Sequence, residues 1–134
     1  MFKDVNSKTA YGNMFGKEIV HIAPDIAPHP NPRIGGTDAN SRISLKGSLA
    51  HEWIGHGGAR RAGRNHETTM ANSTEGNPIG IALEECQASI RAARFAPGLT
   101  PIERYTLLRD AINRLKREGL KIREIKHLLF IDEM

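Results

Sequence analysis

The sequence predicts an α+β domain that is mainly helical, with a small N-terminal β-sheet ahead of four helices. Residues 1–47 hold four of the seven prolines and short alternating segments, which is typical of loops and strands. Residues 48–134 place apolar side chains at helical spacing, with Gly and Pro between the segments. A chain of 134 residues fits one compact domain, so we expect residues 1–134 to fold as a single unit.

Two segments of the N-terminal part are predicted to be strands. Lys17–Ala23 alternates between polar and apolar residues, and Arg42–Leu45 is the second such segment. Four prolines within residues 24–32 exclude a helix or a central strand between them. A turn follows the second strand, and Ser48 is the expected N-cap of the first helix.

Four helices are expected after this turn. The first covers about Leu49–Ala62, and the second covers about residues 79–95, just after a proline. Thr100, with Glu103 three residues later, predicts a capping box at the start of the third helix. A short fourth helix over about Ile122–Leu129 closes the domain.

Composition and charge exclude several classes of protein. The net charge is +4, but basic and acidic residues alternate in the C-terminal segment, so nucleic acid is not an expected partner. No stretch approaches ~18 apolar residues, and the N-terminus lacks the apolar region of a secretory signal. The single cysteine, Cys86, excludes an intramolecular disulfide. We expect a cytoplasmic protein, or an effector delivered by a non-classical secretion route.

The segment AHEWIGHG contains a candidate metal-binding group, His51, Glu52 and His56. In the zinc-peptidase signature H-E-x-x-H, two histidines four residues apart bind zinc from one helix face. Here they are five residues apart, which separates them by about 140° on a regular α-helix. One π-bulge restores a common face, and Gly55 is where the backbone distorts at least cost. The alternative is a coincidental group on a surface helix.

The second helix carries the sequence ALEECQASIRAAR. Steps of 100° place Glu85 among small residues, where close helix packing is expected. Glu84 falls on a stripe with Gln87, Arg91 and Arg94, which we expect to face solvent. A buried carboxylate needs a cation or several donors, and a metal held by two histidines meets that need for Glu85. An ion pair with an arginine is the alternative.

These two motifs together resemble a known family. HEWIGH resembles the H-E-x-x-G-H motif of the dipeptidyl peptidase III family of zinc peptidases, and EECQAS resembles its E-E-C-R-A-E motif. Two positions depart from the second motif, because Gln87 replaces its Arg and Ser89 replaces its final Glu. The chain is also too short for the family's second lobe, which forms the dipeptide-binding cleft. The zinc chemistry is therefore implied, and the dipeptidyl specificity is not.

The resemblance implies one Zn²⁺ ion per chain and a role for each motif residue. His51, His56 and Glu85 match the three zinc ligands. Glu52 matches the general base that activates water, and Glu84 matches the glutamate that orients a ligand histidine. Zinc with three protein ligands keeps a fourth position for water and lowers the pKa of that water.

The residue that stabilises the oxyanion is not fixed by either motif. His66, in the loop between the motifs, is our candidate for this catalytic role, and an ordinary loop histidine is the alternative. Other groups with suitable chemistry are Arg60, Arg61, Tyr11 and Tyr105. Zincins hold substrate along a sheet edge near the active helix, so we expect a minimal zincin-like domain in which residues 42–45 form that edge.

The leading hypothesis is a zinc-dependent peptidase that hydrolyses peptide bonds in a peptide or protein substrate. In size, the chain also resembles the C-terminal toxin domains of bacterial polymorphic toxins, which would add a carrier chain and an immunity protein as partners. A second hypothesis is a zinc-binding module without catalysis. A third is a metal-free basic helical interaction domain, which predicts that Glu85 pairs with arginine and that the first helix is undistorted.

Overall fold

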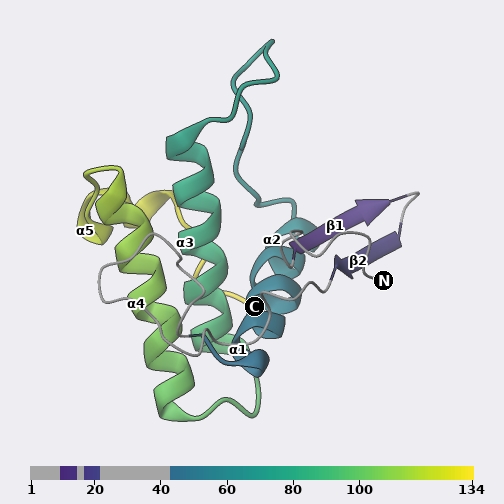
Figure 1. Ribbon diagram of the computed structural model, residues 1–134, viewed down its shortest axis with the longest axis vertical. Helices are drawn as coiled ribbons and strands as arrows, with labels where there is room; N and C mark the ends of the chain where they lie inside the picture. The colour runs from purple at the N-terminus through teal and green to yellow at the C-terminus, as the bar shows by residue number, and fades with distance from the viewer. Residues whose placement is uncertain (1–9, 15–16, 22–42) are drawn as a thin grey trace.

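The computed structural model describes residues 10–14, 17–21 and 43–134 of the chain. It is mainly helical, which confirms that part of the predicted fold class (Figure 1). The helical elements are α1 (Leu45–Ala50), η3 (His51–Gly57), α2 (Gly58–Arg61), α3 (Pro78–Phe95), α4 (Pro101–Arg117), α5 (Ile122–Ile125) and η4 (Lys126–Leu128).

The first helical segment begins earlier than predicted. Residues 43 and 44 are not in a strand and Leu45 opens α1, so the predicted strand Arg42–Leu45 is wrong over its described residues. Ser44, not Ser48, is the N-cap, and its hydroxyl accepts a hydrogen bond from the Gly47 N–H at 3.0 Å. The Ser44 hydroxyl also donates to Glu103 on α4, so a contact from a distant helix helps to fix this start. The sheet edge expected at residues 42–45 is therefore absent at residues 43–45.

Helices α3 and α4 have the boundaries that local signals predict. The Asn77 side chain caps α3 by accepting from the Gly80 N–H at 3.1 Å. Thr100 and Glu103 form both bonds of the predicted capping box at the start of α4. In Figure 1, α4 runs back alongside α3. The predicted fourth helix is shorter and is divided into α5 and η4.

Helix α3 is central to the core, because it packs against both η3 and α4. One buried cluster joins it to α4 and the C-terminal segment through Leu83, Cys86, Ile90, Ala111, Leu115, Ile125, Leu129 and Ile131. A second joins it to α1 and the α3–α4 turn through Ile43, Ala50, Ala92, Ala93, Ala96, Leu99 and Leu107. Burial raises the pKa of the Cys86 thiol to about 12.

Most of the polar stripe of α3 is buried, so the prediction that it faces solvent is wrong for Glu84, Gln87 and Arg91, whereas Arg94 is exposed as predicted. Glu84, Gln87 and Arg91 are each less than a tenth exposed. The chain itself covers this side. The Gln87 amide donates to the Arg64 carbonyl at 3.1 Å and its oxygen accepts from the Phe130 N–H at 2.8 Å. These covering segments supply hydrogen bonds to Gln87, which make the burial of its amide tolerable.

Two N-terminal segments have a strand backbone, β1 (Ala10–Met14) and β2 (Lys17–His21). They pair antiparallel, with Ala10 opposite His21, and β2 falls within the segment predicted as the first strand. Both strands contact η3. Among the described helices, none combines the length and apolar character that crossing a membrane requires.

Candidate metal centre

The segment η3 is a π-helix that covers the whole HEWIGHG sequence. This confirms the prediction that the backbone departs from a regular α-helix between the two histidines. In a π-helix the hydrogen-bond register is i to i+5, so a residue lies over the one five positions before it. The imidazole rings of His51 and His56 consequently lie next to each other in a T-shaped arrangement, with centroids 4.7 Å apart and planes at 83°.

Gly55 has a packing role in this π-helix. A Cβ atom at this position would lie 2.7 Å from the Cα atom of Ala88 on α3 and would also contact the Ala88 carbonyl. Backbone atoms cannot move aside cheaply, so only glycine permits the observed approach of η3 to α3. This approach brings the histidines of η3 within reach of the glutamates of α3.

The two histidines converge on a single carboxylate oxygen. The Nε2 atom of His51 lies 2.8 Å from Oε2 of Glu85, and the Nε2 atom of His56 lies 3.0 Å from the same oxygen. Burial opposes the charge on Glu85, but the hydrogen bonds from both histidines outweigh it and hold its pKa well below the usual range. Three potential ligand atoms from two helices therefore meet at one point.

Glu84 holds the other side of His56. Its Oε2 accepts from the Nδ1–H of His56 at 2.6 Å, and its Oε1 accepts from the His66 N–H at 2.8 Å. Burial disfavours the imidazolium, yet the hydrogen bonds to Glu84 and Glu85 raise the pKa of His56 to about 10. Burial likewise opposes the charge on Glu84, but the His56 bond lowers its pKa. Glu84 thus fixes the orientation of the His56 ring.

Glu52 is buried beside the same point. Its Oε1 lies 3.9 Å from Nε2 of His51, farther than the Glu85 oxygen. One potential ligand atom from each of His51, Glu52 and His56 lies within 4.8 Å of the others, and this group could hold a metal ion. The shorter distances to Glu85 favour that residue as the ligand from a carboxylate, with Glu52 next to it.

The structure connects His66 to the glutamate side of the site. Its Nε2–H donates to Oε1 of Gln87 at 2.9 Å, and its main-chain N–H bonds to Glu84. These contacts indicate a role in holding Glu84, and stabilisation of an oxyanion by His66 stays a prediction. Among the other candidates, Arg61 stacks on Trp53, with its guanidinium carbon 4.9 Å from the ring centroid.

The remaining candidates for stabilising the oxyanion lie on three different elements. Arg60 is exposed on α2, and Tyr105 is exposed on α4. Tyr11 contributes backbone to β1, and its side chain lies outside the described part of the structure. No hydrogen bond or ion pair joins Arg60 or Tyr105 to the histidines among the described residues, and the roles of all three candidates stay predictions.

Three residues of the site were not predicted. Ser89 lies 2.9 Å from Nδ1 of His51 and bonds to Asp110 on α4, which in turn accepts from Arg114. The only signal in the sequence was that Ser89 replaces the final Glu of the resembled motif. Asp110 and Arg114 gave no signal, because their position depends on how α4 packs against α3.

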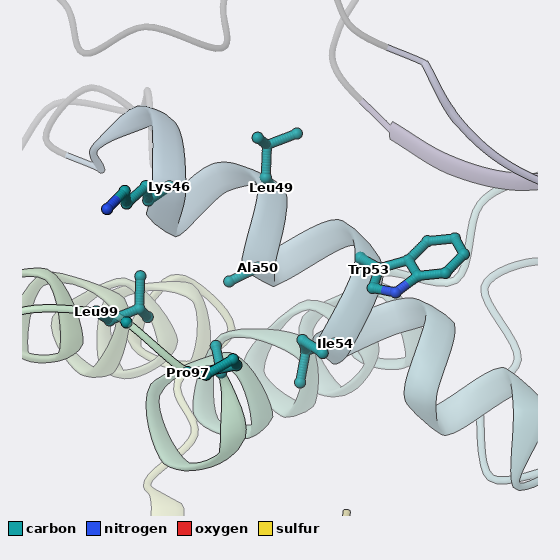
Figure 2. A pocket seen from close by; sticks show the side chains of 9 residues that line it. Lys46, Leu49, Ala50, Trp53, Ile54, Pro97 and Leu99 are labelled. Carbon is teal, nitrogen blue, oxygen red and sulfur yellow. The ribbon is translucent and has the colours of Figure 1, made fainter.

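Two cavities differ in their relation to the site. One of about 310 Å³ borders Glu85 and is lined by Gly76, Pro78, Ile81, Ala82, Glu85, Arg114, Arg117 and Glu118. A second of about 520 Å³ is mostly apolar and lies between α1, η3 and the α3–α4 turn (Figure 2). None of the histidines or glutamates of the site lines the second cavity. Of these two cavities, only the first is lined by a glutamate of the site, Glu85.

The arrangement joins side chains from two separate segments of the sequence. Two imidazoles and a carboxylate meet across two helices, and each motif contributes the side chains expected of it. Comparisons of the chain with protein-family models, with curated proteins and with solved structures found no match, so interpretation of the site depends on its own geometry.

Proposed function

We propose that this protein is a zinc-dependent peptidase that hydrolyses peptide bonds. One observation supports the proposal most strongly. The π-helix brings the Nε2 atoms of His51 and His56 within 3.0 Å of one oxygen of Glu85, while an acceptor occupies the Nδ1 atom of each ring. A ring whose Nδ1 carries the proton presents the lone pair of Nε2, which is the form that binds a metal.

The donor set suits zinc. Imidazole nitrogen and carboxylate oxygen are common zinc ligands, with bond lengths of about 2.0–2.2 Å. Two such ligands at a tetrahedral angle lie about 3.3 Å apart. The distances of 2.8 and 3.0 Å from the Glu85 oxygen to the two imidazoles require an expansion of only a few tenths of an ångström. His51, His56 and Glu85 would hold the ion.

Glu52 is the proposed general base. Zinc held by these residues would supply a Lewis acid and would lower the pKa of a water molecule bound to it. The Glu52 carboxylate, on the residue after His51 and 3.9 Å from its Nε2, accepts the proton and delivers it to the leaving amine. A purely structural zinc site has no use for such a base.

Substrate binding is proposed to use the cavity that borders Glu85 and the backbone of β1. Residues 43–45 offer no strand, whereas β1 contacts η3, the segment that carries both histidines. An extended peptide paired along β1 would pass beside the site, in the mode of strand addition. This places the small N-terminal sheet, rather than residues 42–45, at the substrate.

The competing hypotheses differ in what they require of Glu85 and Glu52. A metal-free interaction module predicted that Glu85 pairs with arginine and that the first helix is regular. Glu85 instead bonds to two histidines, and the helix contains a π segment. A zinc-binding module without catalysis is the second candidate, and it shares the ligands but makes no use of Glu52.

The metal can be tested by measuring zinc in protein purified without a metal-affinity column. We expect about one zinc per chain in the wild type, and loss of it in His56→Ala and Glu85→Ala. Glu75→Ala, which changes an exposed glutamate in the loop before α3, is the matched control and should retain zinc. No zinc in the wild type would end the peptidase proposal.

Catalysis can be tested with Glu52→Gln. We expect this variant to bind zinc normally but to cleave a peptide library at least ~100-fold more slowly than the wild type. Equal rates would assign the activity to a contaminant or to another residue. Absence of cleavage by a zinc-loaded wild type would favour the module without catalysis. In the toxin context, expression of the wild type, but not of Glu52→Gln, should inhibit growth.

A further inference from the structure

A chain of buried hydrogen bonds extends behind His51 into the next helix. The Nδ1 atom of His51 lies 2.9 Å from the Ser89 hydroxyl, and this hydroxyl donates to Oδ2 of Asp110 at 2.6 Å. The same Asp110 oxygen accepts from Nε of Arg114 at 2.8 Å. His51, Ser89 and Asp110 are all at least 96% buried, so water does not compete for these bonds.

The chemistry of the groups sets the direction of the protons. An ionised carboxylate only accepts hydrogen bonds, so the Ser89 proton points to Asp110. The guanidinium of Arg114 donates a charge-assisted hydrogen bond to the same Asp110 oxygen. The Ser89 oxygen is then left with lone pairs toward His51, and Nδ1 of His51 must be the donor. The Nδ1 proton is therefore held on the side of Ser89, and the proton that Nε2 donates to Glu85 is the one that zinc would displace.

We propose that Asp110, acting through the hydroxyl of Ser89, is a positioning residue that keeps His51 in its metal-binding tautomer and orientation. This inference depends on the proposed zinc site. It assigns the two histidines different supports, since His56 bonds directly to the carboxylate of Glu84 whereas His51 reaches a carboxylate through a serine. Partners of this kind typically change metal affinity 10–100-fold when they are removed.

A role in folding alone explains the geometry less well. The second oxygen of Asp110, Oδ1, is buried and has no hydrogen-bond partner. An unpaired buried polar atom costs free energy, so a carboxylate is a poor choice for packing α3 against α4 at this place. A carboxylate is, however, the group that directs the Ser89 proton away from His51.

The experiment measures the zinc affinity of the full chain by competition with a chromophoric chelator. Ser89→Ala removes the link and keeps the pair between Asp110 and Arg114, so we expect zinc affinity to fall at least about tenfold. Asp110→Asn keeps a similar shape without the charge and should also weaken binding. Because both changes break one chain, the double variant should lose much less than the product of the two single losses.

Two matched controls separate this effect from general damage. Ser48→Ala removes a buried serine of α1, and Asp132→Asn removes an exposed carboxylate that pairs with Arg94. Neither should change zinc affinity by more than about twofold. Nitrogen-15 NMR of the histidine rings gives a readout that folding alone would not move. In the zinc-loaded wild type the Nδ1–H proton of His51 should be hydrogen-bonded and slow to exchange, and in Ser89→Ala it should lose both properties.

The outcomes distinguish the positioning role from the zinc site itself. A wild type that binds zinc, with unchanged affinity in Ser89→Ala, overturns the role of Ser89 and Asp110 and leaves the zinc site intact. Weaker binding in Ser89→Ala with wild-type affinity in Asp110→Asn would mean that serine acts alone, and would also overturn the proposal. A wild type without zinc affinity overturns the proposed function and this inference together.

Discussion

Helices η3 and α4 both pack against α3, but they are specified in different ways. Helix α4 has its own start signal, with Pro101 at the first position and a reciprocal capping box between Thr100 and Glu103. The π-helix η3 has no side-chain cap and continues directly from α1. Its π-helical backbone occurs together with two sets of contacts to α3, namely the close approach of Gly55 and the hydrogen bonds of the histidines to the glutamates.

The two helices are therefore stabilised by different interactions, local ones in α4 and tertiary ones in η3. The start of α4 is encoded in neighbouring residues and is worth about 1 kcal/mol of local hydrogen bonding. The π-helix is an uncommon conformation that persists because a second helix supports it. Changes to η3 should therefore disturb the fold and the metal site together, whereas changes to the cap of α4 should affect stability alone.

The largest effect is expected from Gly55→Ala. Helix propensity alone favours alanine over glycine by up to about 1 kcal/mol, but the added Cβ would clash with backbone atoms of Ala88. We expect a net loss of about 3 kcal/mol or more in the free energy of unfolding, together with loss of zinc binding. Urea denaturation and a zinc titration measure the two effects. Gly76→Ala is the control, because its Cβ would meet only Ile81 at an ordinary 3.4 Å. Stabilisation by Gly55→Ala would contradict the packing role.

The second largest effect is a dependence of the stability of the metal-free protein on pH, through His56. The pKa of His56 is raised from 6.5 to about 10 in the folded state, so its contribution to stability is complete below pH 6.5 and is lost as the pH rises toward 10. The free energy of unfolding should therefore fall steadily as the pH rises from 7 to 9. Urea denaturation at several pH values measures this slope. His56→Ala should abolish it, whereas exposed His127→Ala should not; a slope retained in His56→Ala would assign the titration to another group.

The smallest effect is expected from Thr100→Ala at the cap of α4. Loss of the bond from the Thr100 hydroxyl to the Glu103 N–H should cost about 1 kcal/mol of unfolding free energy. Zinc affinity should stay within about twofold of the wild type, since the cap lies outside the metal centre. Thr106→Ala, inside the same helix, is the control and should change stability less. A large fall in zinc affinity in Thr100→Ala would show that the two helices are not independent.

Local sequence signals predicted much of the helical part. Both ends of α3 and the start of α4 follow from prolines and caps within a few residues of each boundary. The need for a π distortion between His51 and His56 follows from their spacing alone. The convergence of Glu85 with them follows from its place among the small residues of α3, where another helix can approach closely.

The predictions that were wrong or missing concern features that depend on contacts between residues far apart in the sequence. Ser44 and Ser48 are both acceptable caps by local criteria, and the bond from Ser44 to Glu103, 59 residues away, accompanies the earlier start. Glu84 and Gln87 were placed toward solvent because a helical wheel does not include the segments that cover this side of α3. Asp110 was missed for the same reason, since it meets Ser89 only after α3 and α4 pack together.

Alkylation of Cys86 can be used to measure how often the helices around this residue separate. The thiol is buried between the helices, next to Glu85 in the sequence, and its raised pKa keeps it in the unreactive protonated form. An alkylating reagent should therefore modify the chain only when α3 separates from its neighbours. Because the sequence contains no other cysteine, the rate of that single modification measures how often the candidate metal centre comes apart, and bound zinc should slow it.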